Sequence, residues 1–507
     1  MGIGNIIKRL RDIMRNDEGV NGDAQRIEQI VWILFLKVYD SREELWEFNN
    51  ERFQSIIPEK LRWRNWAIDN KDGKAITGDE LLNFVNNELF PTLKNLPVDE
   101  KTPMSKAIVK YVFEDINNYM KDGILLRQVI NEIDSIEFTE SKERHEFNDI
   151  YETMLKELQS AGSAGEYYTP RPVTNFMVEM IKPTLNEKIA DFACGTGGFL
   201  TSTLDYLSNQ VKTVEDKELY NNSIYGIEKK SLPYLLCITN LLLHNIDEPN
   251  VDHMNSLGRN VREFSEDEKY DVILMNPPYG GAEKKNIQAN FPVDLRDSET
   301  ADLFLVLILY RLKQNGRVAI ILPDGFLFGL DNTKVNIKKK ILSECNLHTI
   351  IRMPGSVFAP YTSITTNILF FDKTKPTDKI WYYRMDMPEG YKNFSKTKPI
   401  LNEHFNPVKE WWNDRKEIVD PKENEDATTT YKSKCYSIKE IEENGYNLDL
   451  CGYPHEEEVI LEPKELIEQY QEKRASLNAE IDKILAEVSK LLEETNYEKS
   501  IEKWKFF

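Results

Sequence analysis

A glycine-rich turn between two apolar segments constrains the fold of this chain more than any other feature. Residues 188–192 have the pattern of a short strand, residues 199–207 are apolar and helix-like, and the sequence ACGTGG joins them. Glycines let a backbone approach a ligand closely and adopt positive φ without steric cost. Strand, glycine turn and helix in this order are typical of the ligand-binding turn of doubly wound α/β folds. The sequence therefore predicts an α/β, Rossmann-like domain.

The surrounding sequence supports this fold class. Strand-like and helix-like segments alternate between about residues 160 and 400, as βαβ units with a mostly parallel sheet require. Residues 363–371 are expected to pair antiparallel with this sheet. The other strand candidates of this mostly parallel sheet include residues 188–192, 223–227, 270–275, 317–322 and 347–352.

The spacing of the glycines distinguishes between ligands. It does not match G-x-G-x-x-G, which disfavours a dinucleotide-binding site. No Lys-Ser/Thr follows the glycines, which disfavours a phosphate-binding loop. A turn for the methionine part of S-adenosylmethionine fits better, with Asp191 near the ammonium group. A purely structural glycine turn is the alternative. The other turn residues expected at the cofactor are Ala193, Gly195, Thr196, Gly197 and Gly198.

A second carboxylate, Glu228, ends the strand-like sequence YGIE. In open α/β sheets an acid at the end of the second strand commonly takes a ribose hydroxyl. Glu228 lies farther from the turn than the usual distance of about 20 residues, and the polar stretch 208–222 accounts for the excess. A surface glutamate before two lysines is the alternative. Asn255 is the candidate for a contact to the adenine ring of the cofactor.

The sequence Asn276-Pro277-Pro278-Tyr279 follows the apolar run 270–275. The Asn276 side-chain oxygen and the carbonyl beside the first proline can both accept hydrogen bonds from one exocyclic amino group. The Tyr279 ring can stack on the base that carries this amine. The motif therefore suits methylation of an amine on a planar ring, whereas a Pro-Pro turn leaving a sheet is the structural alternative.

Together these motifs resemble the modification (M) subunits of type I restriction–modification systems, which are adenine-N6 DNA methyltransferases. The resemblance covers roughly residues 165–372. Phe192 departs from it, because proline is commoner after the acid. The matching segments are GEYYTPRPV at 165–173, DFACGTGGFL at 191–200, YGIE at 225–228, NPPYG at 276–280, ILPDGFLF at 321–328 and FAPYTSITTNILFF at 358–371.

The resemblance implies roles for residues ahead of the glycine turn. Tyr168, Thr169 and Pro170 would cap the cofactor site. Asn276 rather than Ser or Asp would favour the N6 amine of adenine over the N4 amine of cytosine. The implied reaction is direct methyl transfer, with no metal required and no obvious general base.

The resemblance also implies that the target adenine leaves the DNA stack, since the enzyme cannot reach it inside a duplex. In several relatives the flipped base lies between the tyrosine of the motif, here Tyr279, and a second aromatic ring. Phe358 is the candidate for this second wall, and Tyr361 is the alternative.

A net charge of −20, from 65 basic and 85 acidic residues, is unfavourable for DNA binding, because affinity for duplex DNA comes largely from Lys and Arg. Either DNA is not the substrate, or a partner supplies most contacts. The resemblance implies a separate specificity (S) subunit, two M per S, and a restriction (R) subunit in the full complex. Lysines at 284–285 and 334–340 are candidates for a basic patch, with a solvated helix face as the alternative.

The composition is that of a large intracellular protein. A chain of 507 residues buries a sizeable core in two or three domains. Its 5 cysteines include no C-x-x-C pair and its 6 histidines are dispersed, so neither disulfides nor a metal site is indicated. The N-terminus lacks a signal-peptide pattern, and the apolar run 30–36 is too short to span a bilayer. A cytoplasmic protein without membrane attachment is expected.

The chain divides into four predicted parts: a helical domain (1–155), the methyltransferase domain (156–400), a linker or subdomain (401–455) and a helical partner-binding segment (456–507). The last part carries an apolar heptad seam typical of a coiled coil, which the resemblance implies docks on the S subunit. A long helix packed on its own domain is the alternative. The seam consists of Ile467, Tyr470, Leu477, Ile481, Ile484, Val488 and Leu491.

Two other functions compete with the DNA methyltransferase. A protein-glutamine methyltransferase also uses Asn-Pro-Pro-Tyr, since an amide nitrogen poses the same geometric problem, but such enzymes are shorter and lack the GEYYTP segment. A non-catalytic scaffold subunit of a restriction complex is the second competitor. The intact set of Asp191, Glu228 and Asn276 argues against it.

Overall fold

The computed structural model describes residues 3–69, 75–136, 168–359, 361–395, 397–420, 430–452 and scattered positions from 470 to 489. The chain forms two compact units, Met1–Gly452 and Tyr453–Phe507. Of the predicted heptad seam, Tyr470 and Ile481 are described, and both are helical and exposed. The other seam positions lie outside the described residues. Among the described helices, none has the length and apolarity that crossing a membrane would require.

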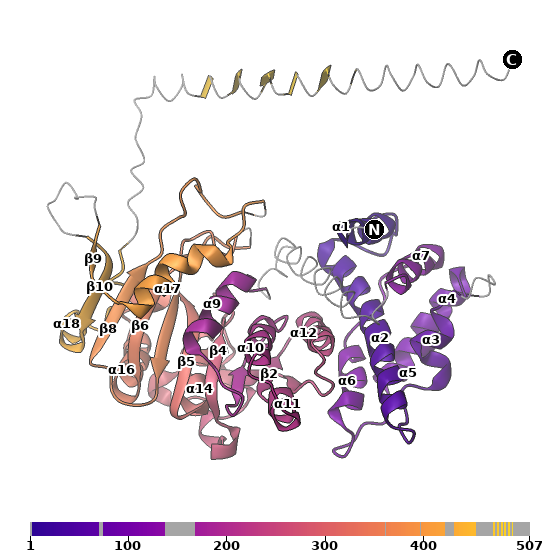
Figure 1. The fold of residues 1–507 in the computed structure, drawn as a ribbon, viewed down its shortest axis with the longest axis horizontal. Helices are drawn as coiled ribbons and strands as arrows, with labels where there is room; N and C mark the ends of the chain where they lie inside the picture. The colour runs from indigo at the N-terminus through magenta and orange to yellow at the C-terminus, as the bar shows by residue number, and fades with distance from the viewer. Residues whose placement is uncertain are drawn as a thin grey trace. The chain divides into compact units, whose positions relative to one another are not determined.

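The region before residue 137 is helical, as predicted (Figure 1). The long helix α2 is its centre, because Val31, Trp32 and Phe35 are fully buried against the neighbouring helices. Asp122 caps α7 by accepting hydrogen bonds from the Ile124 and Leu125 N–H groups. The helices are α1 (Ile3–Met14), α2 (Asp23–Asn49), α3 (Trp63–Trp66), α4 (Gly78–Phe84), α5 (Phe90–Lys94), α6 (Met104–Phe113) and α7 (Gly123–Asp134).

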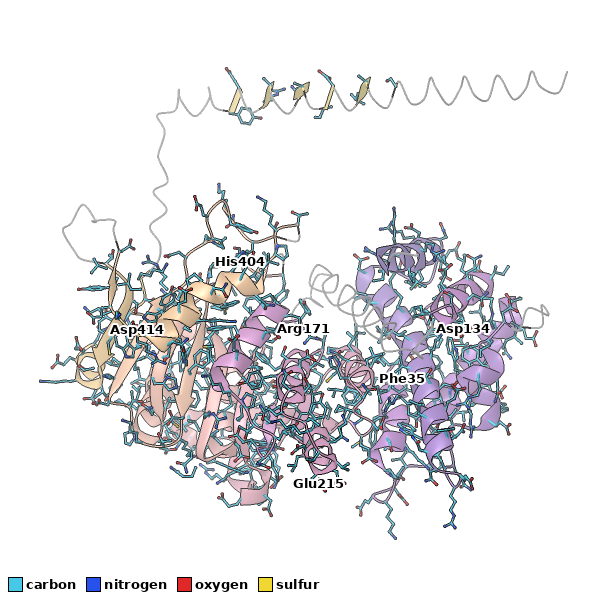
Figure 2. All side chains as sticks on the ribbon, in the orientation of Figure 1. Phe35, Asp134, Arg171, Glu215, His404 and Asp414 are labelled. Carbon is cyan, nitrogen blue, oxygen red and sulfur yellow. The ribbon has the colours of Figure 1, made fainter. Side chains whose placement is uncertain are left out.

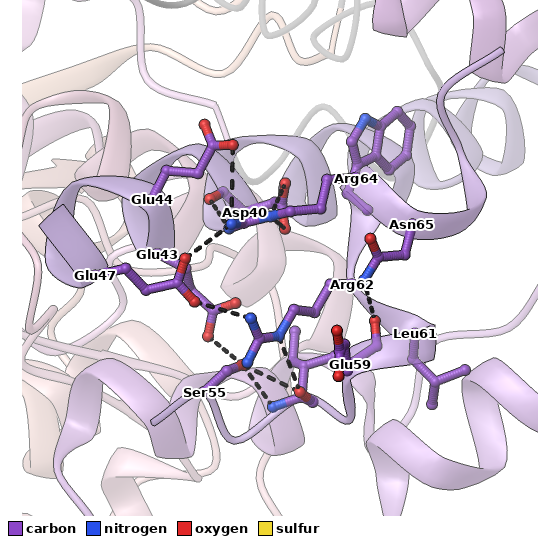
Figure 3. A network of polar contacts seen from close by, with 12 residues as sticks. Asp40, Glu43, Glu44, Glu47, Ser55, Glu59, Leu61, Arg62, Arg64 and Asn65 are labelled. Carbon is purple, nitrogen blue, oxygen red and sulfur yellow. Dashed lines mark hydrogen bonds and ion pairs between the residues drawn. The ribbon is translucent and has the colours of Figure 1, made fainter. Parts of the chain in front are cut away.

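An ionic network joins the C-terminal half of α2 to α3 (Figure 3). Arg64 Nε lies 3.0 Å from Asp40 Oδ1, and Arg64 Nη1 lies 2.8 Å from Glu47 Oε2. Glu43 is fully buried beside them and accepts a hydrogen bond from the Ser55 hydroxyl. Burial raises the pKa of the Glu43 carboxyl to about 7, because the charged form loses its hydration.

The remainder of this unit is built on a 10-stranded sheet in the order β3-β2-β1-β4-β5-β7-β6-β8-β10-β9. The strands are β1 (Ile189–Asp191), β2 (Ile224–Glu228), β3 (Val251–His253), β4 (Tyr270–Met275), β5 (Leu312–Pro323), β6 (Asn346–Arg352), β7 (Thr366–Asp372), β8 (Lys379–Arg384), β9 (Ile418–Val419) and β10 (Tyr431–Ser437).

All of the predicted strands are present. From β3 to β5 every neighbouring pair is parallel. The predicted antiparallel partner is β7, which pairs with both β5 and β6. The strands β3, β8, β9 and β10 had no counterpart among the predictions. The α/β fold with a helical N-terminal region is confirmed.

Helices cover both faces of the sheet (Figure 1). On β4, Val272 and Leu274 belong to one apolar cluster, whereas Ile273 and Met275 belong to another. A strand buried on both faces has a continuous apolar sequence rather than an alternating one, which explains the run YDVILM. The helices are α9 (Arg171–Ile181), α10 (Gly198–Ser208), α11 (Val214–Asn221), α12 (Ser231–Leu243), α13 (Lys285–Gln288), α14 (Thr300–Arg311), α15 (Asp324–Phe328), α16 (Asn332–Glu344), α17 (Asn406–Asn413) and α18 (Ile438–Glu443).

The direction of strand order reverses at β1. The chain runs from β1 to β2 and β3 on one side, and then returns to place β4 on the other side. In open α/β sheets ligands bind outside the carboxyl ends of the strands at such a reversal. The residues that follow the adjacent strands β1 and β4 are therefore brought to one crevice.

The basic patch predicted on residues 334–340 is wrong for two of its lysines. These residues lie in α16, where Lys338 is fully buried and donates to the Leu327 and Gly329 carbonyls. Burial lowers the pKa of Lys338 to about 8. Lys334 is also buried and lies 2.9 Å from both Glu299 Oε2 and Asp302 Oδ2 (Nζ to oxygen). These two lysines are buried against partners within the protein, so they do not belong to an exposed basic patch.

Replacing Glu43 with glutamine is expected to stabilise the protein at pH 8 and to have little effect at pH 5. The Glu43 pKa is raised from 4.5 to about 7 in the folded state. The folded protein holds the Glu43 proton more tightly than the unfolded chain does. The stability that this carboxyl group contributes is therefore fully present below pH 4.5 and is lost as the pH rises through about 7. The gain expected at pH 8 is about 1–3 kcal/mol. The change in stability is measured by comparing the unfolding midpoints of Glu43→Gln and the unchanged protein at pH 5 and pH 8. A variant that is less stable than the unchanged protein at pH 8 would contradict the burial argument.

Candidate active site

A cavity of about 520 Å³ lies at the carboxyl ends of β1, β2 and β4. Of the predicted site residues, those that line it are Thr169, Asp191, Ala193, Gly195, Gly198, Glu228, Asn255, Asn276 and Pro278. The predicted site residues outside its lining are Tyr168, Pro170, Thr196, Gly197, Pro277, Tyr279 and Phe358.

The glycine turn connects β1 to α10 in a backbone conformation that needs glycine. Gly195 has φ +55° and Gly197 has φ +79°, and α10 begins directly after Gly197. A Cβ on Gly197 would lie 2.9 Å from Cys237 Sγ. Thr196 is buried, and its carbonyl accepts a hydrogen bond from Asn240 Nδ2 (3.1 Å). Gly197 and Thr196 do not line the cavity. They fix the shape of the turn through their contacts with α12.

Glu228 braces this turn through both carboxylate oxygens. Its Oε2 accepts a hydrogen bond from the Gly195 N–H at 2.9 Å, and its Oε1 accepts one from the Lys230 N–H at 2.7 Å. Glu228 also lines the cavity. The carboxylate joins the ends of β1 and β2.

Asp191 ends β1 and is 2% exposed. Its Oδ1 accepts a hydrogen bond from the Ala193 N–H at 3.1 Å. Burial, with a smaller contribution from the charge of Glu228, raises the pKa of Asp191 to about 8. No cationic side chain among the described residues forms an ion pair with this carboxyl group, which lines the cavity. A cation bound in the cavity would favour its charged form.

The loop after β3 closes another part of the cavity. Ser256 donates from its hydroxyl to the Phe192 carbonyl (2.5 Å), which ties this loop to the end of β1. Asn255 lines the cavity, and its Oδ1 accepts a hydrogen bond from the Leu257 N–H at 3.1 Å. The contact predicted between Asn255 and an adenine ring remains a prediction.

The side chain of Asn276 has a hydrogen-bond partner at each end of its amide. Its Nδ2 donates to Thr169 Oγ1 at 3.0 Å, and its Oδ1 accepts a hydrogen bond from the Tyr279 hydroxyl. Burial, together with the neighbouring Tyr361, raises the pKa of Tyr279 well above its usual value. The Tyr279 hydroxyl therefore stays protonated and donates to the oxygen that was predicted to accept from the substrate amine, which keeps a second lone pair.

Phe358 is buried beside Tyr279, with ring centroids 6.5 Å apart and ring planes at 79°. This edge-to-face geometry does not form a slot between parallel rings. A flat base can stack between the two only if one ring rotates. The assignment of Phe358 or Tyr361 as the second wall remains a prediction.

Several cavity residues were not predicted. Lys229, Lys230 and Lys284 contribute cations, while Thr300 and Phe304 come from α14. The lysines could have been predicted, because Lys229 and Lys230 follow Glu228 and Lys284 lies shortly after the Asn276 motif. No signal in the sequence indicates that α14 lines the cavity.

The loop after Tyr279 is fastened to the start of α14. The Thr300 N–H donates to the Gly281 carbonyl at 2.9 Å, and the Glu283 N–H donates to the Ser298 carbonyl at 2.8 Å. A Cβ on Gly281 would lie 2.7 Å from Thr300 Oγ1. Gly281 therefore permits a close approach of the two segments.

A hydrogen bond network also fixes the helix that precedes the cavity. Arg171, on α9 and labelled in Figure 2, donates from Nη1 to the Gly198 carbonyl at 2.8 Å and to Thr201 Oγ1 at 2.5 Å. Residues 168–170 lie directly before this arginine, so they are held against the start of α10. Within the described residues, no group of three or more His, Cys, Asp or Glu is arranged to bind a metal ion.

Comparison with protein families gives two matches that together cover most of the chain. Residues 142–460 match the N-6 DNA Methylase family, and residues 3–133 match the HsdM N-terminal domain family. The boundary between the matches falls between the helical region and the α/β region.

Full-length relatives give the same result. The methylase subunit of the type I restriction enzyme EcoEI of Escherichia coli is 50% identical over 482 residues, which cover 94% of this chain and 96% of that protein. The EcoKI methylase subunit of E. coli strain K12 is 28% identical over 404 residues, covering 75% of this chain and 70% of that protein.

Two solved structures are similar over nearly the whole chain. A modification subunit assigned to a type I restriction enzyme of Vibrio vulnificus YJ016 is 42% identical, with a TM-score of 0.75 and coverage of 89% of this chain and 96% of that one. A chain from a structural study of complex assembly in a type I R-M system is 33% identical, with a TM-score of 0.77 and coverage of 97% and 98%.

Replacing Glu228 with glutamine is expected to loosen the glycine turn. Glutamine offers one acceptor oxygen, and its NH₂ group would face one of the two backbone N–H donors that Glu228 now accepts from. Loss of one hydrogen bond to a charged acceptor costs about 1.5–3 kcal/mol. The unfolding midpoint should fall, and amide exchange at Gly195 and Lys230 should accelerate. Unchanged exchange at both positions would show that Glu228 does not brace the turn.

Proposed function

Because this chain belongs to the N-6 DNA methylase family, as one of its type I methylase subunits, we propose that the cavity beside Asn276 is its catalytic site. The chain is an adenine-specific DNA methyltransferase. This location is supported by one observation: residues of the Asn276 motif and of the glycine turn line the same cavity of about 520 Å³. The target amine would enter from the Asn276 side of this cavity.

We propose S-adenosylmethionine as the methyl donor, which supplies an electrophilic methyl group on a sulfonium. The residues of the cavity fit such a ligand. The turn around Gly195 brings backbone close to it without a side chain. The buried carboxyl of Asp191 faces the cavity, where a ligand ammonium group would compensate its charge. Glu228 and Asn255 also line the cavity, and we propose that they contact the ribose hydroxyls and the adenine ring of the cofactor, respectively.

The Asn276 side chain would orient the substrate. Its Oδ1 and the Pro277 carbonyl accept hydrogen bonds from the N6 amine, which turns the nitrogen lone pair out of conjugation with the ring and toward the methyl group. Positioning of this kind can remove several kcal/mol of the barrier. The Tyr279 ring would stack on the adenine. Unstacking the base costs a few kcal/mol, which these contacts offset.

A partner subunit would supply most of the DNA affinity. The chain carries a net charge of −20, so its own surface repels the phosphate backbone on average. We propose that it acts with a specificity (S) subunit in an M2S1 assembly, joined by a restriction (R) subunit in the full complex. Residues 456–507 are the proposed docking segment for the S subunit.

The proposed division of the chain follows these roles. Residues 1–155 form the helical domain, 156–400 the catalytic domain, 401–455 a linker or subdomain, and 456–507 the partner-binding segment. A cytoplasmic location is part of the same proposal, because the substrate is the DNA of the cell.

Changing Asn276 to alanine is expected to abolish methylation, because the amine loses its side-chain acceptor. Modified-base sequencing of genomic DNA from cells carrying the intact gene or Asn276→Ala tests this. N6-methyladenine should occur at one split sequence motif in the first strain and disappear in the second. Persisting methylation in the variant strain would contradict the catalytic role of Asn276. An intact gene that leaves no methylated motif would instead favour a scaffold or a protein-glutamine methyltransferase.

Cofactor affinity is expected to increase with pH between 6 and 8. The pKa of Asp191 is raised to about 8 in the empty cavity, so the carboxyl is largely protonated at pH 6. A ligand ammonium group binds the charged carboxylate, and affinity should rise by up to tenfold per pH unit until it levels off. Isothermal titration with S-adenosylhomocysteine, which keeps the ammonium group, measures this.

The matched control for this pH dependence is Asp191→Asn. The variant has no titrating carboxyl at this position, so its affinity should be weak and should change little between pH 6 and 8. A flat profile in the unchanged protein would remove Asp191 from the ammonium site. A steep profile that persists in Asp191→Asn would assign the pH dependence to another group.

A further inference from the structure

The helix α12 belongs structurally to both the helical region before residue 137 and the α/β region. Its sequence from Pro233 to Leu243, PYLLCITNLLL, is almost entirely apolar, and every residue of it is buried. A helix that is apolar all round is buried among neighbouring elements rather than exposed at a surface. In the structure α12 packs against α2 and α6 of the helical region and against α10, β2 and β3 of the α/β region. It is therefore a packing element that the two regions share.

The middle of α12 contacts the glycine turn. Asn240 Nδ2 donates to the Thr196 carbonyl at 3.1 Å. A backbone carbonyl can only accept, so this contact directs the nitrogen of the Asn240 amide, and not its oxygen, at the turn. Three residues earlier, Cys237 Sγ lies 3.8 Å from Cys194 Sγ, and it would lie 2.9 Å from a Cβ on Gly197. Two side chains of α12 thus contact three residues of the turn.

The helical region contacts α12 at both of its ends. At the start of the helix, the Ser231 hydroxyl donates to Asp115 Oδ2 at 3.1 Å. Directly after the helix, Arg42 of α2 donates from Nη1 to Asn245 Oδ1 at 3.0 Å and from Nε to Asp247 Oδ1 at 2.8 Å. Arg42 therefore binds the loop that ends α12 at two points.

The helical region does not itself line the cavity. Every lining residue belongs to the α/β region, so the described residues before 137 act on a bound cofactor only through other elements. The helix α12 contacts both α2 and the glycine turn. A turn that already has its binding conformation gives a tighter complex, because binding then costs less conformational entropy.

We propose that the helical region sets the affinity for the cofactor by fixing the position of α12 against the glycine turn. Asn240 is a positioning residue, which acts through the Thr196 carbonyl and needs no contact with the cofactor. Arg42 fixes the end of α12 from the helical region. This inference rests on the proposed cofactor site.

The first test compares Asn240→Leu with Thr239→Val in the full chain. Leucine is close to asparagine in size but has no donor, so the Thr196 carbonyl loses its partner. The affinity for S-adenosylhomocysteine, measured by isothermal titration, should fall about tenfold, as loss of one buried hydrogen bond predicts. Thr239→Val is the matched control and should leave the affinity unchanged. Thr239 is a buried threonine of the same helix, and its hydroxyl donates to the Leu235 carbonyl and not to the turn.

The second test compares Arg42→Met with Arg64→Met, because both arginines form ion pairs but only Arg42 contacts the loop after α12. Arg64 pairs with Asp40 and Glu47 inside the helical region. The affinity for S-adenosylhomocysteine should fall about two- to fivefold in Arg42→Met, as loss of a partly exposed ion pair predicts. Arg64→Met should lower the unfolding midpoint at least as much and leave this affinity unchanged.

Three outcomes would overturn the inference. Equal losses of affinity in Arg42→Met and Arg64→Met would assign the effect to a general destabilisation of the helical region. Weaker binding in Asn240→Leu with unchanged binding in Arg42→Met would make α12 a support of the turn that does not depend on the helical region. Unchanged binding in both variants would remove α12 from any role at the cofactor. If the unchanged protein binds no S-adenosylhomocysteine, the proposed cofactor site itself fails, and this outcome is seen before any variant is measured.

Discussion

The parallel pairing of β1 with β4 is the constraint on which the site depends. Ile189 and Ala190 pair with Val272 and Ile273, so both strands end at the same edge of the sheet. Asp191 closes one strand and Asn276 follows the other. Because the direction of strand order reverses at β1, the loops after these strands diverge and leave a cavity between them. The apolar faces of β4, each packed in its own cluster, fix this pairing.

The charges around the cavity are organised in two ways. Glu228 is compensated by backbone N–H groups, and Lys334 compensates the acids at the start of α14. Asp191 differs from these acids because no cation among the described residues pairs with it, and burial raises its pKa to about 8. A buried acid of this kind destabilises the empty protein in its charged form and favours binding of a cation. The structural acids and the ligand-binding acid are thus distinguished by their partners.

Features carried by contiguous residues could be predicted from the sequence. The strands β1, β2, β4, β5 and β6, the glycine turn and the antiparallel β7 each follow from a local pattern of apolar residues and glycines, whereas β3, β8, β9 and β10 were not predicted. Contacts between distant segments could not be predicted. The hydrogen bond from Asn276 to Thr169 joins residues 107 positions apart, and no periodicity encodes it. The burial of Lys338 was also missed, because a lysine-rich helix has the same composition whether its lysines meet solvent or carbonyl groups.

A structure of the complex assembled with its specificity subunit, bound to its target duplex and to an unreactive analogue of S-adenosylmethionine, tests the central claim most directly. The account predicts that the adenine N6 lies within about 3.2 Å of Asn276 Oδ1, with the cofactor in the cavity beside Asp191 and Glu228. A flipped adenine whose amine is bound elsewhere would contradict it.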